Sequence, residues 1–145
     1  MAAFVVDASI ACKAVVEEAG SVLAHTLFSG DDRLVAPSYV LIECANALRK
    51  KAASGGLDRA SAVAAYDDLV GLPFELVPVT STLTRDALEL ALAIGHPVQD
   101  CIYLAVAREQ AASVVTADMA FVRAVRRHRD LAALIVPITE AAARR

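Results

Sequence analysis

The sequence has no uninterrupted apolar run long enough to cross a membrane, no paired-cysteine motif and no excess of basic charge. A membrane-spanning helix needs about 18 or more consecutive apolar residues. Here the hydrophobic fraction is 57%, but charged residues repeatedly break the apolar runs. The segment Met1 to Ile10 has no basic lead and carries Asp7 within its apolar run, unlike a secretory signal. We therefore expect a protein of the cytoplasm.

Cysteine, histidine and glycine are too sparsely placed for several common kinds of site. The cysteines occur singly and never in the CxxC spacing of zinc or redox sites, so we expect them to be reduced and buried; they are Cys12, Cys44 and Cys101. No GxGxxG follows the first apolar run, which argues against a dinucleotide-binding domain. The histidines are not spaced as metal ligands, and we expect surface or turn positions for them; they are His25, His96 and His128.

The net charge of −3 argues against a protein that coats nucleic acid, because such proteins are usually basic. It does not exclude an enzyme that holds a nucleic-acid substrate with local basic clusters. Two clusters suit that role, and the candidate contacts are Arg49, Lys50, Arg123 and Arg126. The competing interpretation of each cluster is a solvated helix face.

The order of the apolar runs predicts an α/β protein. Short, mainly apolar runs begin at Phe4, Leu34, Ser113 and Leu134, as expected for strands covered on both faces of a parallel sheet. Leu76 to Val79 is a fifth candidate. The intervening segments have helical spacing, and we expect helices over 8–16, 21–28, 39–53, 58–70, 82–94, 98–111 and 119–128, with Ser38 as the cap of the third. A chain of 145 residues fits one domain, 1–145, of three layers around about five parallel strands. Residues 141–145 are expected to form a frayed tail.

Two aspartates follow predicted strands directly. Asp7 comes after the first strand, and Asp118 comes after the strand at Ser113 to Thr116. Because the carboxyl ends of parallel strands share one edge, where ligand crevices form, both acids are candidates for a site. Each also precedes a helical segment, and capping that helix is a sufficient alternative reason for an aspartate.

Two further acids lie within predicted helices. Asp100 lies in the first turn of the helix after Pro97, where the helix dipole favours a negative charge. Glu43 lies inside an otherwise apolar helix, and Asn46 shares its face three residues later. Because an isolated buried charge is costly, Glu43 needs a polar destination, which can be a salt bridge or a metal site.

Taken together, the four acids predict a divalent-metal site. Carboxylates crowded into one cleft repel one another unless some are protonated or a cation is present. Oxygen ligands favour Mg²⁺ or Mn²⁺ over zinc, and such an ion can activate water to hydrolyse a phosphodiester without a histidine base. Ser9 and Thr116, each two residues from an aspartate, are candidates to hydrogen-bond to the carboxylates or to metal-bound water.

Four segments of the sequence resemble the motif blocks of PIN-domain ribonucleases, and the short chain resembles the VapC group of bacterial toxins. The blocks are Val5 to Ser9, Ile42 to Leu48, Pro97 to Ala105 and Val115 to Phe121, in the family's order and spacing. Any one block is weak evidence, whereas the four together are specific.

The resemblance implies a PIN fold and an Mg²⁺- or Mn²⁺-dependent endoribonuclease. Asp7, Glu43, Asp100 and Asp118 match the family's acidic positions, Asn46 its polar partner on the helix, and Ser9 and Thr116 its small hydroxyl positions. It further implies an RNA substrate, a cognate antitoxin, a homodimer, and a heterotetramer or larger assembly with that antitoxin. Met119 and Ala120 follow Asp118 where the family often has another charged residue, so we expect one well-formed metal site.

Two alternatives remain open on the sequence. A phosphatase of the haloacid dehalogenase type also begins with an aspartate after its first strand, but it has a second acid two positions later, where this chain has Ser9. The other alternative is a catalytically idle interaction module. Loss of metal-dependent RNA cleavage in Asp7→Asn or Asp100→Asn would separate an enzyme from such a module.

Overall fold

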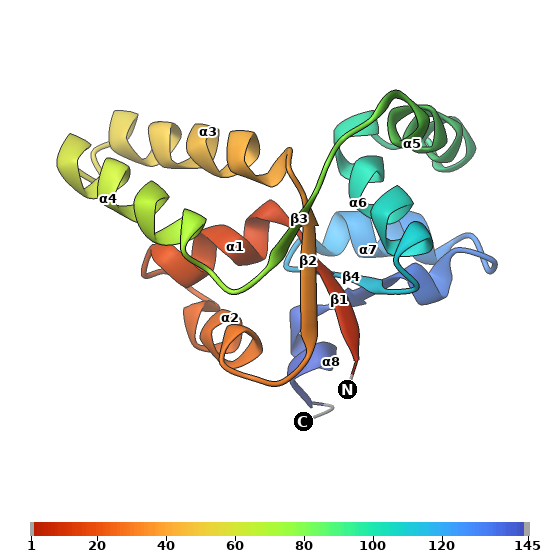
Figure 1. Cartoon of the computed structure of the whole chain (residues 1–145), viewed down its shortest axis with the longest axis horizontal. Coiled ribbons are helices and arrows are strands. Elements are labelled where there is room, and N and C mark those ends of the chain that lie inside the picture. Colours follow the sequence, from red (N-terminus) through yellow and green to blue (C-terminus); the bar gives the residue numbers. More distant parts are fainter. Residues whose placement is uncertain (1, 144–145) are drawn as a thin grey trace.

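A five-stranded parallel sheet forms the centre of the molecule in the computed structural model, which describes residues 2–143 (Figure 1). The strand order is β3-β2-β1-β4-β5, and every pairing is parallel. The strands are β1 (Ala3–Val6), β2 (Arg33–Pro37), β3 (Glu75–Val77), β4 (Ser113–Thr116) and β5 (Ile135–Pro137). The predicted α/β class with about five parallel strands is confirmed.

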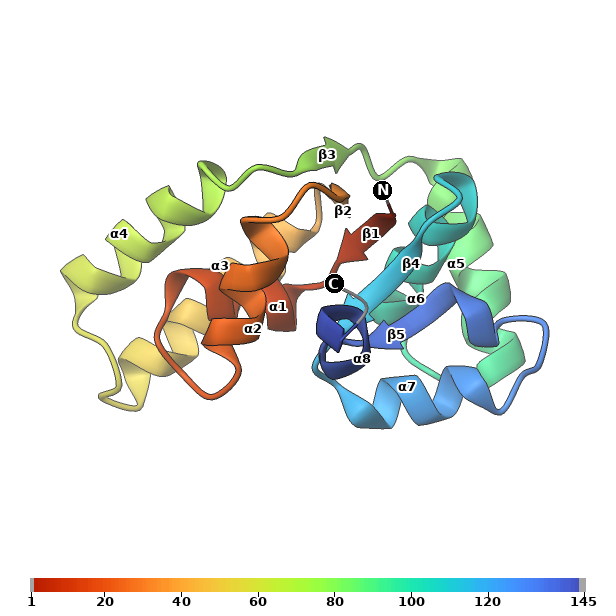
Figure 2. The same ribbon diagram turned by 90° about the horizontal axis from the view of Figure 1, so that it is seen from below.

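Helices cover both faces of the sheet and make a three-layer structure. One group lies on one side of the sheet, with α1 against β4, and comprises α1 (Ala8–Val15), α2 (Ser21–Phe28), α3 (Val40–Ala53) and α4 (Arg59–Val70). The other lies across the sheet and comprises α5 (Ser81–Ile94), α6 (Val98–Glu109) and α7 (Met119–Arg126) (Figures 1 and 2). The short helix α8 (Ile138–Ala143) packs against α2 and β5, and a 3₁₀ turn, η1 (Ala132–Leu134), precedes β5.

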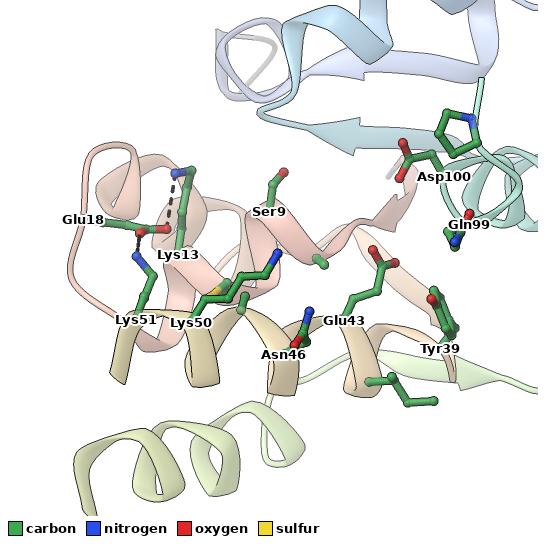
Figure 3. Close-up of a pocket in the computed structure, with 15 residues that line it drawn as sticks. Ser9, Lys13, Glu18, Tyr39, Glu43, Asn46, Lys50, Lys51, Gln99 and Asp100 are labelled. Carbon is green, nitrogen blue, oxygen red and sulfur yellow. Dashed lines mark hydrogen bonds and ion pairs between the residues drawn. The ribbon is translucent and has the colours of Figure 1, made fainter. Parts of the chain in front are cut away.

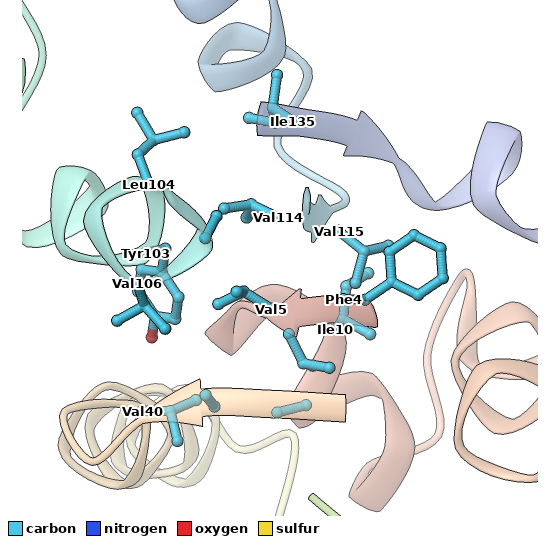
Figure 4. Close-up of a cluster of buried hydrophobic side chains, with 14 of the residues drawn as sticks. Phe4, Val5, Ile10, Val40, Tyr103, Leu104, Val106, Val114, Val115 and Ile135 are labelled. Atoms are coloured by element: carbon cyan, nitrogen blue, oxygen red, sulfur yellow. The ribbon is translucent and has the colours of Figure 1, made fainter. Parts of the chain in front are cut away.

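The core is formed where α6 meets the sheet. Tyr103, Leu104 and Val106 of α6 face Val5 of β1 and Val114 of β4 (Figure 4), and all five are buried. Between residues 2 and 143, no single helix is long and apolar enough to cross a membrane. The pair α5 and α6 meets that length and composition test only as a unit bent by 113°. Cys12, Cys44 and Cys101 are buried and free, as predicted.

Several predicted boundaries are wrong by one or a few residues. Tyr39 takes the N-cap position of α3 without a side-chain bond, and Ser38 instead donates its backbone N–H to Val77 O. Strand β3 starts at Glu75 and ends before Pro78, which lies outside the ladder because proline has no N–H to donate. The expected frayed tail is wrong for residues 141–143, since Ala141 is buried in α8. Residues 144–145 lie outside the described part.

The chain order places a crevice beside β1. From β1 the sheet continues to β2 and β3 on one side and to β4 and β5 on the other, so the direction of winding changes between β1 and β4. In open parallel sheets, ligand sites form at such a switch, outside the carboxyl ends of the strands. Asp7 and Asp118 follow β1 and β4 there, and α1 and α3 also begin at this edge.

Candidate active site

Asp7 is a buried carboxylate held by three donors. Its side chain is 8% exposed. Oδ1 accepts from Ser9 Oγ at 2.6 Å and from the Ile10 N–H at 3.3 Å, which caps α1. Oδ2 accepts a short hydrogen bond from Thr116 Oγ1. The alternative role of Asp7 as a helix cap is thus present, but capping does not require two additional hydroxyl donors.

Ser9 and Thr116 tie Asp7 to the end of β4. Ser9 Oγ accepts from the Ala117 N–H at 3.1 Å, and Thr116 Oγ1 accepts from the Asp118 N–H at 3.0 Å. Each hydroxyl therefore has its own proton available for Asp7. Since Thr116 is fully buried, its hydroxyl has no water to bond instead. The two candidate hydroxyls thus fix the orientation of the Asp7 carboxylate.

The electrostatics of Asp7 oppose its ionised form. Burial raises the pKa of Asp7 to about 6 from its ordinary value of 3.8, and the charge of Asp100 adds to the rise. The hydrogen bonds from Ser9, Thr116 and the Ile10 backbone act in the opposite direction, because they stabilise the carboxylate. A nearby cation would remove the conflict between burial and ionisation.

Glu43 comes from the first turn of α3 and lacks the compensation that Asp7 has. Its Oε1 is buried without a hydrogen-bond partner, and no lysine, arginine or histidine within residues 2–143 makes an ion pair with it. Burial, followed by the charges of Asp100 and Asp7, raises the pKa of Glu43, and the nearby Tyr103 hydroxyl lowers it. The Tyr103 hydroxyl is the polar neighbour of Glu43, although their contact falls outside normal hydrogen-bond geometry. The salt-bridge destination considered for Glu43 is therefore wrong.

Asp100, in the first turn of α6, is held by a histidine that the sequence interpretation placed in a simple turn. His96 Nε2 lies 2.8 Å from Asp100 Oδ2, and its side chain is only 17% exposed. The imidazole stacks on Phe121 of α7, with centroids 4.8 Å apart and planes at 17°. His96 lies in the turn between α5 and α6, as expected, but its contacts with Asp100 and Phe121 were not predicted. His96 thus connects Asp100, at the start of α6, with Phe121 of α7 and fixes the position of the Asp100 carboxylate.

Glu43 and Asp100 border one open cavity of about 840 Å³, and Ser9, the hydrogen-bond partner of Asp7, lines it as well. The carboxylates of Glu43 and Asp100 point into it from α3 and α6, with Ser9 on the α1 side (Figure 3). Asn46 lines the same cavity one turn beyond Glu43, and its Oδ1 accepts from Arg49 Nε at 3.0 Å. Three of the four predicted acids are thus near enough to one another for the charges of Asp7 and Asp100 to raise the pKa of Glu43.

Asp118 occupies a different position from the other three acids. Its side chain is exposed, and Oδ1 accepts from the Phe121 N–H at 3.2 Å as the cap of α7. It does not line the cavity, although its backbone is joined to Asp7 through Thr116. The capping role considered for Asp118 accounts for its contacts.

The predicted basic contacts are divided among different surfaces. Lys50 lines the cavity. Arg49 also borders an apolar groove between α3 and α4, on another side of α3. Arg126 makes two bonds to Glu140, at 3.1 and 2.9 Å, and Arg123 is exposed on α7.

The acids are the residue types that bind a hard cation, although their side chains do not form a complete coordination shell. Across residues 2–143, no three His, Cys, Asp or Glu side chains lie close enough as placed to ligate one ion. Nevertheless, Glu43 offers a buried carboxylate oxygen that makes no ion pair within residues 2–143, and Asp7 and Asp100 offer further oxygens. This donor set fits Mg²⁺ or Mn²⁺, which prefer carboxylates and water.

The arrangement of the acids agrees with the protein family whose model the sequence matches. Residues 4–127 match the PIN domain family. The chain belongs to the PIN domain family. This confirms the resemblance and replaces the haloacid dehalogenase alternative. A comparison with curated proteins finds no significant match.

Solved structures with the PIN fold align over most of this chain. The protein PAE2754 from Pyrobaculum aerophilum is 20% identical with a TM-score of 0.72, over 99% of this chain and 96% of that one. VapC20 from Mycobacterium tuberculosis, described as a sarcin-ricin-loop-cleaving toxin, is 20% identical with a TM-score of 0.63, over 77% and 86%. VapBC-1 from nontypeable Haemophilus influenzae is 15% identical with a TM-score of 0.64, over 94% and 98%. At these identities the likeness shows a shared fold.

Proposed function

We propose that this PIN domain is a metal-dependent endoribonuclease and the toxin of a type II toxin-antitoxin pair, acting in the cytoplasm. The observation that carries the proposal is the Glu43 carboxylate, which lies in a pocket shared with Asp100 and beside Asp7 and has no cationic partner within residues 2–143. A buried carboxylate without a cationic partner would destabilise the fold if its role were only structural. A cation used in catalysis supplies the missing partner.

Asp7, Glu43 and Asp100 would hold the ion, which we propose to be Mg²⁺ or Mn²⁺. When bound, such an ion lowers the pKa of a coordinated water and stabilises charge on the phosphate. Asp118 belongs to the proposal as the acid after the neighbouring strand, where its charge adds to the negative potential of this edge. With Met119 next in the chain, a single ion remains our proposal.

The protein's own residues prepare the site before substrate arrives. Ser9 and Thr116 fix the Asp7 carboxylate, so that its oxygens need no rearrangement. His96 does the same for Asp100. Asn46 lines the cavity beyond Glu43 and can donate its amide N–H to an oxygen of the substrate. Lys50 lines the same wall and is the predicted RNA contact best placed to meet a phosphate.

The proposed partners are a cognate antitoxin and a second copy of the chain. Solved structures that share this fold include VapBC toxin-antitoxin systems, which supports an antitoxin here. The apolar groove between α3 and α4, with exposed Val63 at its rim, suits an apolar helix face. On α5, Leu88 and Leu92 are exposed one turn apart, which supports a homodimer and a heterotetramer or larger complex with antitoxin.

RNA cleavage by purified variants tests the proposal. We expect the wild type to cut single-stranded RNA with Mg²⁺ or Mn²⁺ and to stop when the metal is chelated. Asp7→Asn and Asp100→Asn should be inactive while remaining folded. Asp58→Asn is the matched control, because Asp58 caps α4 from an exposed position outside the cavity. Unchanged cleavage in Asp7→Asn and Asp100→Asn would refute the nuclease assignment.

A further inference from the structure

All lysines of the chain line the cavity that two of the acids border. Lysine occurs only at positions 13, 50 and 51 of the sequence. Lys13, Lys50 and Lys51 all line the cavity that Glu43 and Asp100 border (Figure 3). Over residues 2–143, no arginine lines it. The concentration of one residue type in one cavity is what an unassigned binding site for an anion would show.

The two helices that form the walls separate acids from lysines. Asp7 caps the start of α1 and Lys13 lies in its last turn. Glu43 lies in the first turn of α3, and Lys50 and Lys51 lie in its last turn. Seven residues separate Glu43 from Lys50, which is about 10 Å along a helix axis. The cavity therefore has an acidic end at the sheet and a basic end away from it.

Glu18 organises the basic end without neutralising it. Its Oε2 lies 2.5 Å from Lys51 Nζ, and its Oε1 lies 3.3 Å from Lys13 Nζ. One carboxylate thus holds two ammonium groups in place. Lys50 makes no hydrogen bond or ion pair with any residue of the described chain, and Figure 3 shows it reaching across the cavity toward α1. Three positive charges against one negative charge leave this end net positive.

We infer that the basic end, defined by Lys13, Lys50 and Lys51, binds a phosphate of the RNA strand that neighbours the phosphate being cut. This inference rests on the proposed nuclease function and adds to it the path of the substrate. Lysine suits the role, because its ammonium is a point charge with rotatable donors that accepts a phosphate in several orientations. Lys50 binds the phosphate first, since Glu18 already holds the other two lysines.

The separation of charges explains how one cavity can serve both a cation and an anion. Lysines placed beside Glu43 and Asp100 would pair with them and displace a metal. The two groups of charges are anchored about 10 Å apart along the axis of α3, and salt in the open cavity weakens the attraction between them. A strand that spans the cavity brings one phosphate to each end. The basic end would thus hold RNA in register with the acids.

The salt dependence of RNA binding tests the inference. A labelled single-stranded RNA is titrated in chelator, so that no cleavage occurs, over a range of salt. The plot of log affinity against log salt has a negative slope, and each lost phosphate contact on single-stranded nucleic acid makes it shallower by roughly 0.7. We expect that reduction in Lys50→Ala. Arg108→Ala is the matched control, since it removes one charge from the exposed last turn of α6, outside the cavity, and should leave the slope unchanged.

Amine acetylation of the unmutated protein gives an independent measurement. Because there are only three lysines, mass spectrometry can follow each separately. Bound RNA should slow acetylation of Lys50 several-fold. Suppose that Lys50→Ala and the wild type have equal slopes, that RNA does not protect the lysines, and that the protein still cleaves RNA. That result would refute phosphate binding by the basic end and leave the proposed nuclease function intact. A wild type that neither binds nor cleaves RNA would overturn both.

Discussion

Replacing Asp7 with asparagine should change the stability of the metal-free protein in a pH-dependent way. The pKa of Asp7 is about 6 in the folded protein against an ordinary 3.8, chiefly because the carboxyl is buried. The folded state therefore binds this proton more tightly than the unfolded state does. The resulting stabilisation is complete below about pH 4 and is lost as the pH rises through about 6. Asparagine carries no such proton and escapes the loss.

The size of the effect follows from the two pKa values. Each unit of pKa corresponds to about 1.4 kcal/mol, so a rise from 3.8 to about 6 corresponds to about 3 kcal/mol. The free energy of unfolding of Asp7→Asn, minus that of the wild type, should therefore increase by about 3 kcal/mol from acid to neutral pH. Any constant offset from imperfect hydrogen bonds to Ser9 and Thr116 cancels in that change.

Urea unfolding in chelator, followed by far-ultraviolet circular dichroism because the chain has no tryptophan, measures the change. Asp58→Asn is the control for losing a helix cap. Asp58 is exposed, and the N–H of Ser61 lowers its pKa, so that variant should gain no stability as the pH rises. A difference between Asp7→Asn and wild type that is the same at about pH 4 and about pH 8 would refute the claim that Asp7 is destabilised by burial.

Three further outcomes follow from individual side chains. Without metal, Glu43→Gln should be at least as stable as the wild type, because like-charge repulsion is relieved, while Mn²⁺ affinity falls; calorimetry that finds a marked loss of apo stability would contradict this. His96→Ala frees Asp100 from its 2.8 Å partner and should lower cleavage or metal affinity by roughly 10- to 100-fold, as steady-state kinetics and Mn²⁺ titration would measure; unchanged values would remove His96 from the site. Leu92→Asp, at a side chain 76% exposed on α5, should convert a dimer to a monomer in light scattering; an unchanged dimer would place the interface elsewhere.

Most of the fold could be predicted from the sequence because its strongest signals are local. Apolar runs ended by acids located β1 and β4, and Ser21–Phe28 was predicted with both ends correct. The errors lie where tertiary contacts outweigh local preference. Serine is a favoured N-cap residue, but the conformation of Ser38 is set by the hydrogen bond from its backbone N–H to Val77 O. The alanine-rich end of the chain has little local signal beyond its helix propensity, and its packing through Ala141 depends on distant residues.

The site was readable only in part, because sequence shows which residues are chemically unusual but not where side chains point. Glu43 was identifiable, since a charge in an apolar helix needs a partner. His96 was missed although it lies four residues before Asp100, because its second contact, Phe121, is distant in the chain. The pairing of Lys51 with Glu18 was missed for the same reason, since only the packing of α1 against α3 brings the two together.

Binding of Mn²⁺ to the purified protein, followed by electron paramagnetic resonance, tests the central claim most directly. Asp7, Glu43 and Asp100 should together bind one ion per chain at neutral pH. The affinity should fall below about pH 6, where Asp7 takes up its proton. Asp100→Asn should lose most of the affinity and Asp58→Asn none of it. No bound ion in the wild type, or equal binding in Asp100→Asn, would contradict the account.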